Sequence, residues 1–209
     1  MGNFPAAFWD ERYAGEAYAY GEAPNAWLSE CVGALPERAD VLVPGDGEGR
    51  NGVFLAKRGH AVTTLDLSER GVGKARALAA RNGVSVDARV QDLLTWDWPE
   101  GAFDAVVLIF VHLRPEGRQA LHRRAAASLR PGGVLIIEGF TPEHLPLREA
   151  NPKVGGPGRA GMLFTPAMLR EDFGALDAIT LEERRVRLSE GAKHDGEAAV
   201  VRGLFRAPA

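Results

Sequence analysis

The sequence predicts an α/β fold: a doubly wound, mostly parallel sheet of seven strands that ends in an antiparallel hairpin. Three observations support it. Short apolar runs alternate with helical segments from residue 37 to residue 140, as in a parallel sheet covered by helices on both faces. A glycine-rich turn joins the first of these runs to the first helix of the series. Two apolar runs near the C-terminus flank a glycine-bounded tip, which indicates a hairpin.

Aromatic side chains gather in residues 1–36. Phe8 and Trp9 belong to a segment with partly helical spacing, which predicts a short amphipathic helix. Tyr20 lies in the Gly- and Pro-containing loop that follows. Two interpretations stay open for this region. It is either a helix packed against the edge of the domain or a lid over a cationic ligand, because aromatic faces attract desolvated cations.

Strands and helices alternate through the middle of the chain. Continuous apolar runs predict central strands that are buried on both faces. Ser68 is a suitable N-cap for one helix, and Pro131-Gly132-Gly133 closes another. The predicted strands are residues 41–44, 61–66, 84–90, 103–110 and 134–140, and the predicted helices are residues 25–35, 52–58, 69–82 and 115–130.

The last third of the chain differs in character. Residues 141–163 are rich in Pro and Gly, and we expect them to form a connection that carries substrate contacts. The elements predicted beyond it are a helix at residues 165–173 and the hairpin strands at residues 179–188 and 198–205. We expect one domain over residues 1–209, made of the aromatic segment 1–36, a ligand-binding core 37–140 and a substrate-side segment 141–209.

Composition limits the classes of partner. The net charge is -3, which argues against nucleic-acid and anionic-membrane partners. Cys31 is the one cysteine, so an internal disulfide and a Cys-rich zinc site are excluded, and no metal is expected. The chain shows neither a secretion-signal pattern nor an apolar run of membrane-spanning length. We therefore expect a cytoplasmic monomer or homodimer that acts on a small molecule.

The glycine-rich turn admits two ligands. Gly47-x-Gly49-x-x-Gly52, with Asp66 after the next strand, satisfies the dinucleotide pattern. Gly45-x-Gly47-x-Gly49 is the alternating pattern of proteins that bind S-adenosylmethionine (SAM). The turn also carries two acids, Asp46 and Glu48, which would repel a pyrophosphate but suit the sulfonium and ammonium groups of SAM. These charges favour SAM, while a turn that binds nothing remains a third possibility.

Five motifs then occur in order at fitting distances. They are residues 41–49, Asp66, Asp92-Leu93, residues 103–107 and residues 129–133. Together they resemble the class I SAM-dependent methyltransferases, and the resemblance covers residues 9–205. It implies a Rossmann-like fold, SAM as cofactor and S-adenosylhomocysteine as product. One position departs from the pattern, because Val43 stands where many members carry an acid.

Within that family, three segments are similar to the small-molecule branch that includes tellurite-resistance and thiopurine methyltransferases. They are Gly47-Glu48-Gly49-Arg50-Asn51, Tyr20-Gly21-x-x-Pro24-Asn25 and the hairpin tip Glu190-Gly191-x-x-His194-x-Gly196. After the fourth strand the chain has Phe110-Val111-His112-Leu113 in place of the Asn-Pro-Pro-Tyr type of motif. This difference speaks against methylation of amino groups on nucleic-acid bases.

The resemblance implies a set of cofactor contacts. Asp66 is expected to bind the ribose hydroxyls and Asp92 the adenine amino group, or else both acids serve as helix caps. The full set of expected SAM contacts is Trp9, Tyr20, Gly45, Asp46, Gly47, Gly49, Arg50, Asn51, Asp66, Leu67, Gln91, Asp92, Leu93 and Ile109.

Two histidines are candidates for catalysis, His112 after the fourth strand and His194 on the hairpin tip. Each either contacts the acceptor, with His194 as a possible general base, or has a structural role. The expected acceptor is a thiol, a selenium or tellurium oxyanion, or a small hydroxylated metabolite. Two rival functions stay open. One is a regulator that binds SAM or a nucleotide without catalysis, and the other is an NAD(P)-dependent oxidoreductase, although no Ser/Tyr/Lys catalytic set is evident.

Overall fold

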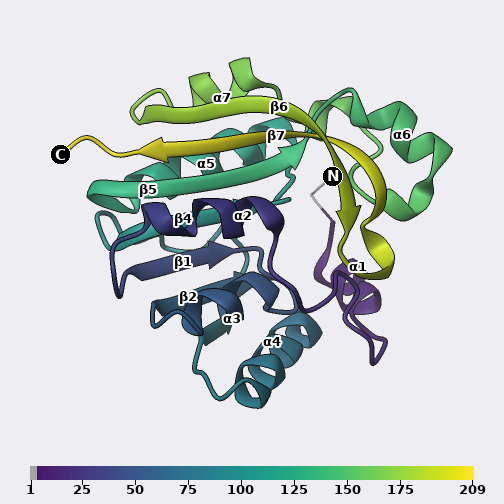
Figure 1. Ribbon diagram of the computed structural model, residues 1–209, viewed down its shortest axis with the longest axis horizontal. Helices are drawn as coiled ribbons and strands as arrows, with labels where there is room; N and C mark the ends of the chain where they lie inside the picture. The colour runs from purple at the N-terminus through teal and green to yellow at the C-terminus, as the bar shows by residue number, and fades with distance from the viewer. Residues whose placement is uncertain (1–3) are drawn as a thin grey trace.

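A computed structural model describes residues 4–209 of the chain (Figure 1). Its strands form one seven-stranded sheet in the order β3-β2-β1-β4-β5-β7-β6. Strands β1 to β5 are parallel, and β7 pairs antiparallel with both β5 and β6. The predicted fold class is confirmed. Residues 1–3 of the predicted aromatic segment lie outside the described residues.

Most elements lie where the sequence pattern predicts them. Ser68 caps α4 as expected, because its Oγ accepts a hydrogen bond from the Gly71 N–H. The strands are β1 Asp40–Pro44, β2 Ala61–Asp66, β3 Asp87–Val90, β4 Phe103–Ile109, β5 Leu129–Phe140, β6 Asp177–Ser189 and β7 Asp195–Arg206. The helices are α1 Ala6–Arg12, α2 Ala26–Cys31, α3 Arg50–Ala56, α4 Glu69–Arg81, α5 Pro115–Ala127, α6 His144–Ala150 and α7 Pro166–Asp172.

The central strands are buried on both faces because their side chains alternate. In β1, Val41 and Val43 pack with Trp27 of α2. The intervening Leu42 points to the opposite face and packs in a cluster with Leu121 of α5. Helices α2 and α3 therefore contribute to the core on one face of the sheet, and α5 and α7 to the core on the other.

The end of α5 and the start of β5 differ from the prediction. The helix stops at Ala127, where the Ser128 hydroxyl donates to the Arg124 carbonyl at 2.8 Å. The chain then pairs at once with the sheet, with Leu129 opposite Phe103. The predicted turn is present as a bulge inside β5: Val134 is the next residue to pair, opposite Ala105, so residues 130–133 loop out between the two pairs, and Gly132 has a left-handed φ of 75°.

Strand β3 is shorter than predicted. The Val84 N–H still donates to the Ala79 carbonyl at the end of α4, at a distance of 3.1 Å. Pairing with β2 begins only at Asp87, which lies opposite Thr63. The alternating pattern of residues 84–86 thus reflects packing under α4 rather than membership of the sheet.

The Pro- and Gly-rich segment 141–163 is more regular than an open connection. It contains α6 and two short 3₁₀ turns, Pro152–Val154 and Ala160–Met162. The Asn151 side chain ties this segment to the hairpin by donating to the Asp195 carbonyl at 2.9 Å. The segment is therefore held against the first residues of β7.

The parallel strands all end at one edge of the sheet, and the hairpin bends toward the same edge. Figure 1 shows α1, α6 and the curved end of β6 and β7 on that side of the molecule. The Lys193 N–H donates to the Ala19 carbonyl at 3.1 Å, which joins the hairpin tip to the aromatic segment. Within residues 4–209, the helices are too short or too polar to span a bilayer.

Candidate active site

The three alternating glycines of the turn after β1 all adopt left-handed conformations, with φ of 68°, 58° and 91° at Gly45, Gly47 and Gly49. Their spatial roles differ. A Cβ on Gly49 would lie 2.6 Å from the Cβ of Ala75, so this glycine allows α3 to approach α4 closely. Gly45 lines the cavities described below, whereas Gly47 and Gly49 do not. The motif thus combines one cavity-lining position with two that shape the backbone.

Two adjoining cavities lie at the carboxyl edge of the sheet. The first, here called the aromatic cavity, has a volume of about 140 Å³, and the second, the carboxylate cavity, about 420 Å³. Six residues line both of them, so the two cavities adjoin one another. The shared residues are Phe4, Trp9, Tyr13, Gly45, Phe110 and His112.

The carboxylate cavity brings together acids from the ends of two strands. Asp66 follows from β2 and Asp92 from β3, and Leu67 and Leu93 lie beside them. This arrangement agrees with the expectation that neighbouring parallel strands deliver their C-terminal residues to one place. Gln91, also expected to contact the cofactor, lines neither cavity, and its N–H donates to the Asp66 carbonyl at 2.8 Å.

Asp66 is held rigidly by the backbone. Its two carboxylate oxygens accept from the N–H groups of Gly47 and Ser68, each at 2.9 Å. Burial raises the pKa of Asp66 to about 6, although these hydrogen bonds oppose the shift. The cap of α4 is Ser68, so Asp66 does not fill the capping role that was its alternative. Asp92 accepts from the Leu94 N–H at 2.9 Å.

The aromatic cavity contains buried charges from the glycine-rich turn and α3. Asp46 accepts from the Gly52 N–H through Oδ2, while its Oδ1 has no hydrogen-bond partner. Burial raises the pKa of Asp46 to about 7. Arg50 pairs with Glu190 at 3.0 Å through Nη2, and its buried Nη1 has no partner. Two residues that line the cavity, Asp46 and Arg50, therefore each have one buried polar atom without a partner among residues 4–209.

His112 lies in the wall between the two cavities, but both of its ring nitrogens are occupied. The Phe140 N–H donates to Nε2 at 3.0 Å, so Nδ1 carries the proton and donates to the Met162 carbonyl at 2.7 Å. Burial lowers the pKa of His112 to about 3, which keeps the ring neutral. The ring can shape the cavity, but it has no free lone pair with which to remove a proton.

His194 is placed differently. Its Nδ1 lies 3.0 Å from Oε2 of Glu190, and no group within residues 4–209 hydrogen-bonds Nε2. The ring packs between Tyr20 and Phe110, with centroid distances of 4.6 and 4.8 Å. Burial lowers the pKa of His194, and the Glu190 carboxylate partly offsets this effect. Of the two predicted histidines, only His194, whose side chain lines the aromatic cavity, has a ring nitrogen without a hydrogen-bond partner in residues 4–209.

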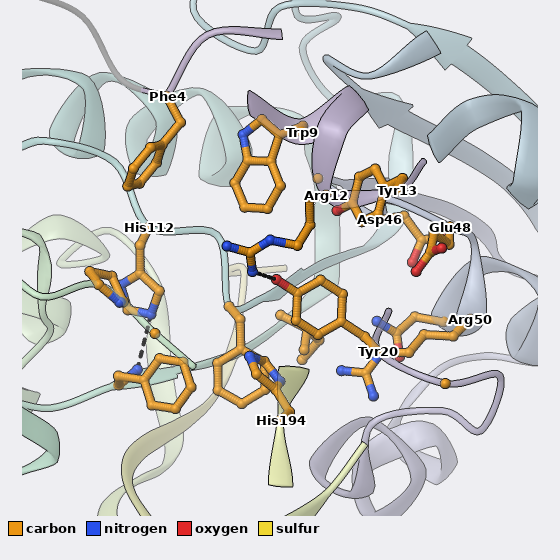
Figure 2. A pocket seen from close by; sticks show the side chains of 18 of the residues that line it. Phe4, Trp9, Arg12, Tyr13, Tyr20, Asp46, Glu48, Arg50, His112 and His194 are labelled. Atoms are coloured by element: carbon orange, nitrogen blue, oxygen red, sulfur yellow. Dashed lines mark hydrogen bonds between the residues drawn. The ribbon is translucent and has the colours of Figure 1, made fainter. Parts of the chain in front are cut away.

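Figure 2 shows the aromatic cavity from close by. Trp9 and Tyr20, both expected at the site, face the same space as His194, with Arg50 and Asp46 on one side. Ile109 and Asn51 also line this cavity. Asn51 is engaged with the backbone, because its Oδ1 accepts from the Asn25 N–H at 3.0 Å. Residues 4–209 hold no group of three or more His, Cys, Asp or Glu side chains arranged for a metal ion.

The sequence analysis missed several residues of the site. Arg12 reaches the aromatic cavity from α1 and donates to the Tyr20 hydroxyl at 2.9 Å. Phe110 contributes a ring and has a left-handed φ of 55°, which is strained for an aromatic residue. Glu190 orients His194. Helical spacing offered one usable signal, since Arg12 stands four residues after Phe8, on the same face of the predicted helix.

Comparisons with known proteins agree with this geometry. Residues 41–133 match the family described as methyltransferase domain. A ubiquinone biosynthesis O-methyltransferase of Paramagnetospirillum magneticum is 37% identical over 100 residues, which are 48% of this chain and 40% of the relative. A tRNA 5-carboxymethoxyuridine methyltransferase of Escherichia coli is 32% identical over 105 residues, 49% of this chain and 40% of the relative. The matches thus span about two fifths of these relatives.

Two further proteins match over more of the chain. The 27-O-demethylrifamycin SV methyltransferase of Amycolatopsis mediterranei is 32% identical over 197 residues, which cover 90% of this chain and 65% of the relative. The crystal structure of TehB from Haemophilus influenzae has the same fold, with a TM-score of 0.71 at 17% identity over 97% of this chain and 66% of TehB. Residues 41–133 thus match a methyltransferase domain, and the glycine-rich turn, the two acids after β2 and β3 and the sheet order agree with the fold of the class I SAM-dependent methyltransferases.

Proposed function

We propose that this protein transfers a methyl group from SAM to an ionisable oxygen or sulfur atom of a small molecule. The observation that carries the proposal is the placement of His194. Its unpartnered Nε2 belongs to a ring in the wall of the aromatic cavity, which adjoins the carboxylate cavity. An acceptor bound among the rings would lie beside a group able to take its proton.

The residues present fit SAM. In the carboxylate cavity, Asp66 would bind the ribose hydroxyls and Asp92 the adenine amino group. The amino-acid end of SAM carries an ammonium and a carboxylate. The unsatisfied oxygen of Asp46 and the unsatisfied nitrogen of Arg50 are complementary to these two charges. When bound, SAM supplies a methyl group on a sulfonium.

The protein's own contribution is positioning, exclusion of water and proton removal. Neutral His194 accepts the acceptor's proton at Nε2, while the Glu190 carboxylate holds its Nδ1–H and stabilises the resulting imidazolium. The rings of Trp9, Tyr20 and Phe110 surround the space and keep water from the nucleophile. This arrangement suits a phenol, enol or thiol, whose proton a neutral imidazole can remove.

The acceptor class can be tested directly. Purified protein and SAM would be incubated with hydroxylated aromatic compounds, small thiols, and selenium and tellurium oxyanions, while formation of S-adenosylhomocysteine is followed. We expect turnover with at least one compound that has an ionisable O–H or S–H group. Turnover with E. coli tRNA alone, the class of acceptor that one relative's name indicates, would contradict the proposal.

The raised pKa of Asp46 predicts how the affinity for the cofactor changes with pH. Its folded-state pKa of about 7 lies above the ordinary 3.8, so the carboxyl is mostly neutral at about pH 6 and mostly ionised at about pH 7.5. Only the ionised form attracts an ammonium group. Affinity for S-adenosylhomocysteine, measured by calorimetry, should therefore rise about fivefold to tenfold over this interval.

The matched variant is Asp46→Asn, which should lose most of this rise. Asp66, whose pKa is raised to about 6, ionises in the same direction and accounts for the smaller part that remains. In the ligand-free protein, raising the pH acts on folding stability in the direction opposite to its effect on cofactor affinity. Stability contributed by neutral Asp46 is present at low pH and is lost as the pH rises through about 7. An affinity that falls with pH in this interval would exclude Asp46 as the ammonium ligand.

A further inference from the structure

Glu190 makes contacts beyond the hydrogen bond to His194 that the proposed reaction uses. Its Oε2 lies 3.0 Å from both His194 Nδ1 and Arg50 Nη2. Its Oε1 accepts from the Asn25 side chain at 3.2 Å. Thus one carboxylate binds the hairpin tip, the start of α3 and the N-cap of α2, three segments that lie apart in the sequence.

The backbone fixes this carboxylate in place. The Glu190 N–H donates to the His194 carbonyl at 2.8 Å and closes the hairpin tip. The next residue, Gly191, has a φ of 69°, and a Cβ there would lie 2.7 Å from the Ala19 carbonyl oxygen. The tip therefore packs against the aromatic segment with no room for a side chain, which leaves Glu190 little freedom to move.

A second carboxylate anchors the junction to the sheet. Asn25 also donates to Glu138 of β5 at 2.6 Å, and Glu138 pairs with Arg202 of β7 at 2.6 Å. The buried charges balance in pairs, Glu138 with Arg202 and Glu190 with Arg50. Burial lowers the pKa of His194, so the ring enters this balanced network in its neutral form.

From these contacts we propose that Glu190 is a positioning residue that sets the tautomer and the basicity of His194 and couples them to Arg50, the first residue of α3 after the glycine-rich turn. Because Glu190 accepts, the Nδ1 of neutral His194 must carry the proton, and Nε2 is left as the base. The Arg50 guanidinium shares the same oxygen and opposes protonation of the ring. This inference extends the role proposed above for His194.

Charged and titratable groups from other elements also act on His194. Arg50 of α3 and Arg12 of α1 lower its pKa, while Glu190 raises it. A charge on His194 in turn lowers the pKa of His112 and of His144. Arg12 also donates a hydrogen bond to the Tyr20 hydroxyl. Glu190 is the only one of these groups that favours the imidazolium. Removing the Glu190 charge is therefore expected to lower the pKa of His194.

The test uses nitrogen NMR of the full-length protein labelled at histidine. In the wild type we expect neutral His194 as the Nδ1–H tautomer. The Nε2–H tautomer in the wild type would overturn the proposal without any variant. In Glu190→Gln we expect a mixture of tautomers and a lower His194 pKa, and an unchanged pattern would also overturn it. The matched control is Glu143→Gln, which removes an acid from the exposed pair with Arg185 and should leave His194 unaffected.

Kinetics with an accepted substrate separate positioning from a structural role. Glu190→Gln should lower kcat about 10- to 100-fold, with little change in the KM for the acceptor, and should shift the acidic limb of the kcat/KM profile to lower pH. Equal losses in kcat at every pH would indicate a structural role instead. If His194→Asn retains full turnover, the base assignment fails, whereas the NMR result on Glu190 decides the positioning separately.

Discussion

Replacing His194 with Asn is expected to lower kcat about 100- to 1,000-fold while leaving the affinity for SAM within about twofold. General-base catalysis accounts for a loss of this size. Asn can occupy the volume between Tyr20 and Phe110, but it cannot take a proton at neutral pH. The residual rate would come from positioning alone, which the cavity walls still provide.

The measurement pairs single-turnover kinetics with calorimetry of SAM binding. The control is His60→Gln, at the opposite edge of the sheet, where the His60 Nδ1 accepts from the Ala39 N–H. That variant should keep both activity and affinity. A loss that disappears when a more acidic acceptor is supplied would strengthen the assignment, because such an acceptor needs less help in losing its proton. Full activity in the Asn variant would remove His194 from the mechanism.

Replacing Asp66 with Ala is expected to weaken SAM binding at least about 100-fold. A carboxylate that accepts from two ribose hydroxyls makes two charged hydrogen bonds, each contributing about 1.5–3 kcal/mol. The same change would leave the N–H groups of Gly47 and Ser68 without their acceptor. We therefore also expect a loss of about 1–3 kcal/mol in the free energy of unfolding. The chain would still fold, because the core clusters do not involve Asp66.

Calorimetry measures the affinity, and chemical unfolding followed by circular dichroism measures the stability. Asp87→Ala is the matched control. Asp87 is the first residue of β3, the strand that leads to Asp92, and its exposed side chain pairs with Arg89. This variant should bind SAM normally. Unchanged affinity in Asp66→Ala would mean that the ribose is held elsewhere.

The sequence was sufficient for the fold and for the cofactor edge. The alternation of apolar runs and helical segments depends on local periodicity, and parallel strands must deliver their C-terminal residues to one edge. Asp66 and Asp92 could be placed together on that basis alone, before any contact was known. Errors were confined to boundaries such as the start of β5, where Leu129 pairs with Phe103 before the predicted turn and the turn itself becomes a bulge within the strand.

The roles of the two histidines required the tertiary structure. The sequence alone does not distinguish the roles of His112 and His194, because both are histidines at the carboxyl edge of the sheet. They differ only in their neighbours. Both ring nitrogens of His112 hydrogen-bond to the backbone, one to the Phe140 N–H and one to the Met162 carbonyl. In His194, Glu190 hydrogen-bonds to one ring nitrogen and leaves the other available. No local sequence pattern predicts which buried N–H or carbonyl group will hydrogen-bond to a given histidine ring.

By itself, the sequence determined the sheet, its glycine-rich turn and the acids that suit a cationic adenosyl ligand, because periodicity, turn chemistry and charge act over a few residues. Only the tertiary structure decided which polar atoms remain unsatisfied and which side chain is free to act. The pairing of Glu190 with Arg50 joins residues 140 positions apart, and Asn25 reaches Glu138 across 113. Such contacts are set by how the chain closes on itself, and burial then fixes the protonation of the groups that meet there.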